Sequence, residues 1–318
     1  KKTKKMLKNI DKSTIFSYPN LAPIYKKLAR LLKISPKKIL LSAGSDAGIK
    51  TVFETFVNEK DKVLRTNPTF AMYKIYSKIF NTKEIIIDYK KTDDGPRLEL
   101  KKILNIITKS KPKLICLPNS DSPTGHSFSK DEIKKILLTA KKANSFVLID
   151  EAYYPFYPNS ALRFIQKYNN LIITRTTAKA WGIAGLRVGY VLSSKRNIEE
   201  MHKVRPMYEI NNLGAELFKI YISKQSIMKK SVERLLEGKK YFRNELKKLG
   251  FKVFKREDGN FVHVNFMDRK KEIIKKLSKR IYFRHSENHK SIKGFSRFSI
   301  TSKKNFFNII KIIKQTIN

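Results

Sequence analysis

A lysine followed eight residues later by an arginine makes the most chemically suggestive stretch of the sequence, Arg175 to Tyr190. Lys179 comes shortly after a predicted buried strand. An amine beside an apolar wall is a potential nucleophile, because desolvation favours the neutral form that can make an imine. Arg187 offers a planar charged fork for a phosphate, and the hydroxyl of Thr176 can add a hydrogen bond. The trio fits a phosphorylated aldehyde cofactor, and the alternative is a glycine-rich turn between strands.

A second candidate group follows the predicted strand Phe146 to Ile149. Asp150 stands at the carboxyl end of that strand, which is where open α/β sheets bind ligands. A carboxylate against a pyridine nitrogen would keep the nitrogen protonated, so that the ring could take up electrons from a substrate. Tyr153 would reach a phenolic oxygen of such a ring. The alternative is an aspartate that only caps the next turn.

Two further segments can contact a phosphorylated ring. Gly44, Ser45 and Asp46 open a predicted helix over Ala47 to Val57, and the free N–H groups of a helix N-terminus favour a phosphate. Phe70 follows another strand and can stack on a planar ring. The alternatives are Asp46 as a helix cap and Phe70 as a core residue.

These residues need a scaffold, and apolar runs that alternate with helical patterns predict one. Such runs indicate a mostly parallel sheet covered by helices. Ser129 with Glu132 forms a capping box that opens an amphipathic helix through Ala143. The predicted strands are Lys38 to Ser42, Lys62 to Thr66, Lys83 to Asp88, Lys113 to Pro118, Phe146 to Asp150, Leu171 to Arg175 and Arg187 to Leu192.

After Tyr208 the pattern changes to that of a smaller α+β unit. The predicted elements there are helices at Leu213 to Ser223 and Ile227 to Leu249, strands at Lys252 to Arg256, Phe261 to Phe266 and Phe295 to Thr301, and a terminal helix from Lys304. We therefore predict an α/β fold with a large cofactor-binding domain at residues 36–208. Residues 1–35 and 209–318 would form the smaller α+β domain, with an N-terminal segment.

The net charge of +42 by itself suggests a nucleic-acid partner. The basic residues are mostly lysines spread over every predicted helix, however, so a basic nucleic-acid-binding protein is only the distant alternative. Cys116 lies in an apolar run and is expected to be a small buried hydrophobe. His285, Glu287 and His289 lack a complete ligand set, so no metal site is predicted. Without an apolar run long enough to cross a bilayer, the chain is expected to be cytoplasmic.

Several segments, in the order in which they occur, resemble the fold-type I pyridoxal-phosphate aminotransferases, and most closely the histidinol-phosphate aminotransferase branch. The matching segments are Ile15-Phe16-Ser17-Tyr18-Pro19, Leu41-Ser42-Ala43-Gly44-Ser45-Asp46, Asn67-Pro68-Thr69-Phe70-Ala71-Met72-Tyr73, Asp150-Glu151-Ala152-Tyr153, Arg175 to Tyr190, and Ser296-Arg297-Phe298-Ser299-Ile300. Together they extend over nearly the whole chain. Several matches in the right order are far more specific than any one of them.

The resemblance implies the aspartate aminotransferase-like fold type I and the cofactor pyridoxal 5′-phosphate, held by Lys179 as a Schiff base. The other implied cofactor contacts are Asp150, Tyr153, Gly44, Ser45, Asp46, Phe70, Ser122, Thr176 and Arg187. Tyr18 would reach the cofactor phosphate of a partner subunit, which implies a homodimer. Arg297 and Arg284 would bind an acidic group of the substrate. The implied activity is transfer of an amino group from a donor, expected to be glutamate, to a keto acceptor in amino-acid biosynthesis.

Three departures from the family pattern bear on the substrate. Ser122 stands where the family usually has an asparagine that donates to the cofactor's ring oxygen. The family's N-terminal Asn-Glu-Asn-Pro segment is not found, and residues 204–211 differ from its usual Pro-Pro-Tyr-Asn-type segment. Histidinol phosphate is therefore one candidate substrate. The alternatives are a decarboxylase of the threonine-phosphate type and a cofactor-binding protein that has lost activity.

Overall fold

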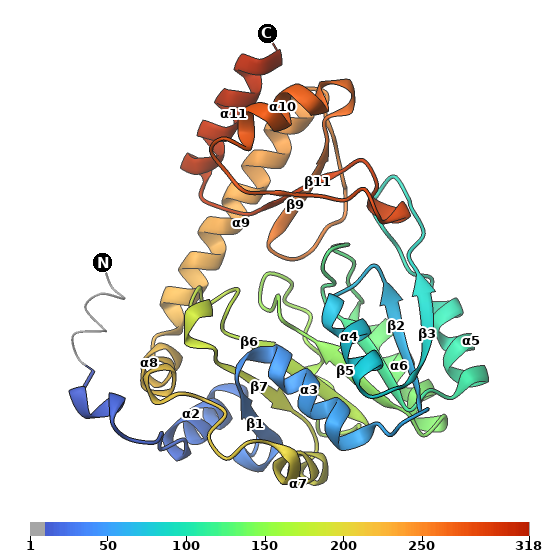
Figure 1. Ribbon diagram of the computed structural model, residues 1–318, viewed down its shortest axis with the longest axis vertical. Helices are drawn as coiled ribbons and strands as arrows, with labels where there is room; N and C mark the ends of the chain where they lie inside the picture. The colour runs from blue at the N-terminus through green and yellow to red at the C-terminus, as the bar shows by residue number, and fades with distance from the viewer. Residues whose placement is uncertain (1–9, 318) are drawn as a thin grey trace.

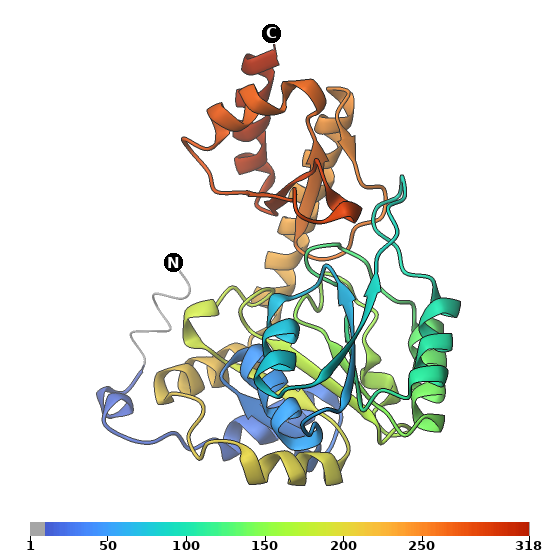
Figure 2. The same ribbon diagram turned by 45° about the vertical axis from the view of Figure 1, so that its right-hand side comes forward.

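The computed structural model describes residues 10–317, and these fold into two lobes (Figure 1 and Figure 2). The larger lobe holds the N-terminal part of the chain, and the smaller C-terminal lobe stands above it in both views. The long helix α9 (Gln225–Lys248) runs from the large lobe into the small one. Residues that line a site between the lobes can therefore come from distant parts of the sequence.

The large lobe is built on a seven-stranded sheet in the order β1-β7-β6-β5-β4-β2-β3. Its strands are β1 (Ile39–Ser42), β2 (Lys62–Asn67), β3 (Lys83–Asp88), β4 (Leu114–Pro118), β5 (Phe146–Asp150), β6 (Leu171–Thr176) and β7 (Gly189–Leu192). β7 is antiparallel to both of its neighbours, and the other pairs are parallel. The predicted mostly parallel sheet is confirmed.

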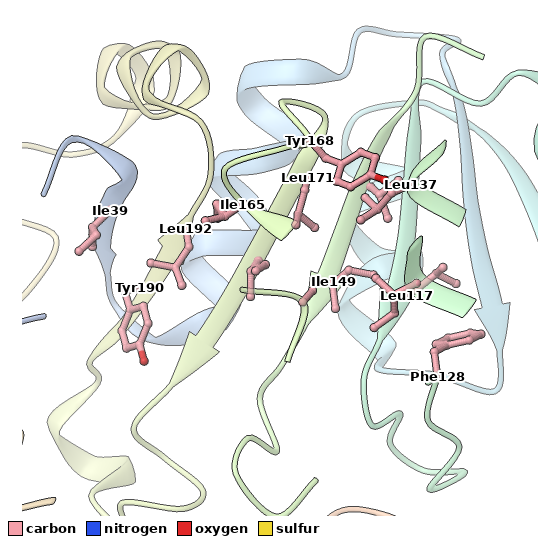
Figure 3. Close-up of a cluster of buried hydrophobic side chains, with 14 of the residues drawn as sticks. Ile39, Leu117, Phe128, Leu137, Ile149, Ile165, Tyr168, Leu171, Tyr190 and Leu192 are labelled. Carbon is pink, nitrogen blue, oxygen red and sulfur yellow. The ribbon is translucent and has the colours of Figure 1, made fainter. Parts of the chain in front are cut away.

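Helices cover both faces of this sheet. Successive strand residues point to opposite sides, so strands that are apolar throughout present an apolar surface on each face. On one face lie α2 (Ala22–Leu32), α5 (Leu100–Ser110), α6 (Lys130–Lys142) and α8 (Asn212–Ile222), and on the other α3 (Gly44–Phe56), α4 (Ala71–Ile79) and α7 (Lys195–Val204). Leu117 and Ile149 pack on the first face (Figure 3). Cys116 and Leu148 pack on the second, which confirms Cys116 as a small buried side chain. Burial on both faces explains why the strands are apolar at nearly every position.

The small lobe pairs a four-stranded antiparallel sheet with helices. Its strands are β8 (Lys252–Val253), β9 (Phe261–Asn265), β10 (Arg284–His285) and β11 (Ser296–Ser299), and its helices are α9, α10 (Lys270–Leu277) and α11 (Lys303–Ile317). Phe242 of α9, Phe298 of β11 and Phe306 of α11 meet in a core of their own. The predicted α+β character of this unit agrees with these elements.

Short 3-10 helices connect the larger elements, at Lys12–Ile15, Pro36–Lys38, Ala161–Phe164, Ala184–Leu186, Met267–Arg269 and Lys290–Ile292. Helices α2 and α8, which fall in the small domain of the sequence-based division, contribute side chains to the core of the large lobe. Residues 1–9 of that division lie outside the described range. Among the helices of residues 10–317, none has the length and apolar character that a membrane crossing requires.

Candidate active site

A cavity of about 670 Å³ lies at the carboxyl ends of β4, β5 and β6, below the small lobe. This is the edge of a parallel sheet at which ligands bind. Most residues singled out from the sequence line it, although they come from both lobes. They are Ser45, Asp46, Phe70, Ser122, Asp150, Tyr153, Thr176, Lys179, Arg187, Arg284 and Arg297.

One end of the cavity is formed by the N-terminus of α3. The residue before the helix, Ala43, provides no side-chain cap, so the first N–H groups have no partner from that side chain. Asp46 is therefore not the helix cap, and its carboxylate accepts a hydrogen bond from Tyr76 Oη at 3.0 Å. Gly44 has a φ of +86°, and a Cβ added there would lie 2.9 Å from Arg187 Nη2. The backbone and the guanidinium thus enclose a pocket suited to a phosphate.

Asp150 lies at the end of β5 and is almost fully buried. Its Oδ1 accepts hydrogen bonds from Thr174 Oγ1 at 3.0 Å and from the Ala152 N–H at 3.1 Å. Tyr73 Oη donates to Oδ2 at 3.3 Å. Burial raises the pKa of the Asp150 carboxyl to about 6, against the lowering effect of these hydrogen bonds. A protonated ring nitrogen beside the carboxylate would offset that cost of desolvation.

Lys179 follows β6 and is exposed to the cavity rather than buried. Its Nζ lies 5.4 Å from the centre of the Tyr153 ring. Tyr153 is itself buried and packs edge-on against Phe261 of β9, with the ring centres 5.6 Å apart. The amine, the phenol and the Asp150 carboxyl therefore border one cavity, as a pyridoxal ring would require.

The opposite end of the cavity carries two arginines from the small lobe. Arg284 of β10 and Arg297 of β11 are directly paired across the sheet. Arg297 Nη1 donates to Ser122 Oγ at 2.9 Å, and its guanidinium lies 5.1 Å from the centre of the Phe261 ring. Burial lowers the pKa of Arg297, and the positive charge of Arg284 lowers it further. Like charges placed side by side favour binding of an anion between them.

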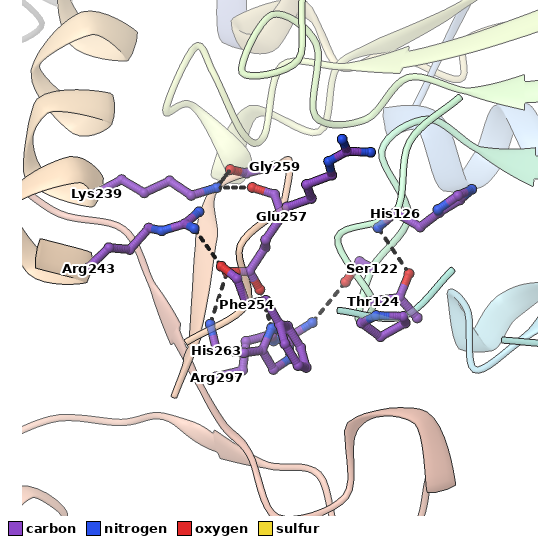
Figure 4. A network of polar contacts seen from close by, with 12 residues as sticks. Ser122, Thr124, His126, Lys239, Arg243, Phe254, Glu257, Gly259, His263 and Arg297 are labelled. Atoms are coloured by element: carbon purple, nitrogen blue, oxygen red, sulfur yellow. Dashed lines mark hydrogen bonds and ion pairs between the residues drawn. The ribbon is translucent and has the colours of Figure 1, made fainter. Parts of the chain in front are cut away.

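A network of polar contacts lies behind Arg297 and reaches across to the large lobe (Figure 4). His263, the cross-strand neighbour of Arg297, makes a buried hydrogen bond through its ring to the Glu257 carboxyl. Lys239 Nζ of α9 donates to the carbonyl oxygen of Glu257 at 2.7 Å and to that of Gly259 at 2.9 Å. The Asp258 N–H donates to the Gly125 carbonyl at 2.9 Å, across the lobe boundary. The strand with Arg297 is therefore fixed relative to the turn with Ser122.

Comparison with known proteins decides the family. The profile of the family "Aminotransferase class I and II" matches residues 1–313. The chain belongs to the class I and II aminotransferases. This aminotransferase is thus a pyridoxal-phosphate-dependent transaminase, as predicted. The residues of the cavity fit the cofactor, because the buried Asp150 carboxyl can face a ring nitrogen and the Gly44 turn leaves room for a phosphate.

Individual relatives show which members of the family the chain is similar to. A histidinol-phosphate aminotransferase of Caldanaerobacter subterraneus is 33% identical over 290 residues, which cover 91% of this chain and 80% of the relative. One of Clostridium novyi is 31% identical over 297 residues, 93% of this chain and 81% of the relative. Among solved structures, the histidinol-phosphate aminotransferase of Clostridium acetobutylicum superposes with a TM-score of 0.86 at 22% identity, covering 98% of this chain and 94% of that one. The L-threonine-O-3-phosphate decarboxylase of Porphyromonas gingivalis gives 0.80 at 18% identity, covering 98% and 96%.

Two predicted residues of the aminotransferase do not line the cavity. Gly44 lies just behind it, against Arg187. Tyr18 is exposed and stacks on Tyr208, with ring centres 4.2 Å apart. Conversely, residues 285–289, for which the sequence predicted no role in the site, line the cavity. Within the described range, Glu287 pairs with Lys270, and no metal-binding group is formed.

Sequence reasoning also missed lining residues next to those it found. Thr69 precedes Phe70, and Ser120 lies two residues before Ser122. Their position beside recognised residues was the available signal. The 285–289 segment gave no such signal in the sequence. It is short and polar and includes part of an exposed two-residue strand, so it has no periodic pattern.

Proposed function

We propose that the enzyme transfers an amino group between glutamate and the keto form of histidinol phosphate. The observation that carries the proposal is the arrangement of the cavity, with the α3 phosphate pocket at one end and the Arg284–Arg297 pair at the other. The names of the relatives support the same substrate. A phosphate on the substrate suits the arginine pair, because two guanidinium groups can bind its oxygens by charge-assisted hydrogen bonds.

Several residues of the cavity would have a defined task in this reaction. Pyridoxal phosphate supplies an aldehyde that takes up the amino group and a ring that accepts electrons from the substrate α-carbon. Gly44, Ser45, Thr176 and Arg187 would hold the cofactor phosphate, and Asp150 would hold a proton on the ring nitrogen. Lys179 Nζ would hold the cofactor through its aldehyde.

Proton movement would fall to Lys179. Its Nζ would carry a proton to and from the substrate α-carbon, which requires an amine that can reach the open cavity. The exposure of Lys179 to the cavity satisfies that requirement. Tyr153 borders the same space and would donate to the ring oxygen. Because donor and acceptor use one site in turn, we expect ping-pong kinetics.

The experiment is an absorption titration of the cofactor-loaded enzyme. Glutamate should bleach the visible band of the lysine-bound cofactor, and histidinol phosphate with 2-oxoglutarate should support turnover. Lys179→Ala should lose the band and the half-reaction, while Lys195→Ala, an exposed lysine on α7, should keep both. A Lys179→Ala protein with the band and undiminished turnover would refute the assignment.

Decarboxylation is the second candidate, favoured by the similarity to the threonine-phosphate decarboxylase structure. Such an enzyme would use Lys179, Asp150 and the arginine pair in the same way but release the carboxylate of its substrate. Measuring carbon dioxide and keto-acid formation in parallel from phosphorylated amino acids separates the two. Carbon dioxide without keto acid would replace the aminotransferase proposal.

We also propose a cytoplasmic homodimer in which Tyr18 reaches the partner's cofactor phosphate. The support is an exposed apolar patch around the stacked Tyr18 and Tyr208, which also includes Ile15, Phe16 and Met207. Sedimentation should give a dimer, and Tyr18→Ala should weaken cofactor binding. A monomer with full activity would contradict this proposal.

A further inference from the structure

A second carboxyl is buried near the cavity and has no task in the reaction described so far. Asp121 lies in the turn between β4 and α6 and is 0% exposed. It forms no ion pair within residues 10–317, and its carboxyl oxygens accept from hydroxyl groups. The donors are Thr66 Oγ1 at 3.2 Å, Thr69 Oγ1 at 2.9 Å and Tyr89 Oη. A buried carboxylate without a cation is costly, so a function for its charge has to be sought.

Asp121 connects two walls of the cofactor cavity. The next residue, Ser122, lines the cavity, and Thr69, which donates to Asp121, lines it together with Phe70. The turn is held at its base, because the Asp121 N–H donates to the His126 carbonyl at 2.8 Å and the Gly125 N–H donates to the Asp121 carbonyl at 2.8 Å. The carboxyl therefore sets the position of the Phe70 segment relative to the Ser122 turn.

Asp121 also interacts electrostatically with Asp150. Tyr73 Oη donates to Asp150, and the negative charges of both aspartates add to burial in raising the pKa of Tyr73. Burial raises the pKa of Asp121 to about 7, and the charge of Asp150 contributes in the same direction. The groups around the two carboxyls are Thr66, Thr69, Tyr73, Tyr89, Cys116, His126, Glu151 and Thr174, with Arg65 acting on Cys116. The two nearby cations, Arg65 and Arg175, are paired with Glu84 and Glu151, and burial lowers the pKa of His126 to about 3.

We propose that Asp121 is a positioning residue for the cofactor: it fixes the Thr69–Phe70 segment against the Ser122 turn, and its negative charge adds to that of Asp150 in keeping the ring nitrogen protonated. The inference rests on the placement of the ring nitrogen against Asp150 in the proposed function. In this arrangement the protonated ring is the cation that the two buried carboxylates lack.

The test uses enzyme loaded with pyridoxal phosphate labelled with ¹⁵N in the ring. Asp121→Asn keeps the shape of the side chain and removes its charge, so the pH at which the ring nitrogen loses its proton should fall by about one unit. Tyr89→Phe is a milder change that removes a donor to Asp121 and should shift the same titration in the same direction. Thr69→Val cuts the tie to the Phe70 segment and should raise the cofactor Kd about 5- to 10-fold.

Each result decides the inference. A merely structural role would lower the Tm of Asp121→Asn but leave the nitrogen titration where it is in the wild type, and that result would overturn the proposal. If Asp121→Asn does not fold, an unshifted titration in Tyr89→Phe overturns it equally. A wild-type protein that binds no cofactor would instead refute the proposed function, so the two failures are distinguishable.

Discussion

Gly44 offers a sharp test of the phosphate pocket. Its φ of +86° lies in the left-handed region, and a Cβ there would lie 2.9 Å from Arg187 Nη2. In Gly44→Ala the guanidinium has to move, and since it ends a flexible side chain it can do so at little cost to folding. The substitution should therefore affect cofactor binding more than stability.

The effects of Gly44→Ala on stability and on cofactor binding can both be estimated. An alanine in the left-handed region costs about 1 kcal/mol of folding free energy. Moving Arg187 away from the phosphate removes a charge-assisted hydrogen bond, which contributes about 1.5–3 kcal/mol. The cofactor Kd should accordingly rise about 10- to 100-fold.

Gly250→Ala is the matched control for this change. Gly250 follows α9 with a φ of +80°, and a Cβ there would meet no atom within 4 Å. Both variants should lose similar stability in urea unfolding of the apoprotein, and only Gly44→Ala should bind the cofactor weakly in a fluorescence titration. Equal cofactor affinities in the two variants would refute the reasoning.

Three further outcomes follow from the site. Ser122→Asn should lower the pKa of the cofactor's absorption band by at most about one unit in a spectroscopic titration, because a stronger donor supports the charged ring oxygen; an unchanged or raised pKa would count against Ser122 as that donor. Arg297→Lys should raise the KM for the acidic substrate about tenfold, since lysine lacks the bidentate fork; an unaltered KM would remove Arg297 from the substrate site. Burial lowers the pKa of His126 to about 3, so the folded protein binds fewer protons than the unfolded chain between pH 6.5 and 3. The free energy of unfolding should therefore decrease as the pH falls through this range, by at most about 1.4 kcal/mol per pH unit. His126→Phe should flatten this dependence in urea unfolding at pH 7 and 5, and an equally steep dependence would contradict the assignment.

The large sheet was predictable because burial on both faces leaves a continuous apolar run at each strand. The strand ends were less so. β7 was expected from Arg187 but begins at Gly189, because Arg187 has a left-handed φ of 52° and turns toward the α3 terminus. β10 was missed because its two residues, Arg284 and His285, are exposed and have no apolar pattern.

The site was predictable where a motif keeps its residues close in sequence, as around Asp150 and Lys179. Asp121 was not recognised, although it stands next to Ser122. Its partners Thr66, Thr69 and Tyr89 come from the ends of β2 and β3, and only the folded sheet brings them to one carboxyl. Spacing along one chain does not reveal a contact that depends on strand order.

The division of the cavity between the lobes has a consequence for synthesis of the protein. Every residue assigned to the cofactor within one chain lies between Gly44 and Arg187, whereas both substrate arginines come from the C-terminal strands β10 and β11. A chain that leaves the ribosome N-terminus first completes the cofactor-binding lobe before Arg297 has been translated. We therefore expect the nascent protein to complete the residues that would hold its cofactor before those that would recognise a substrate.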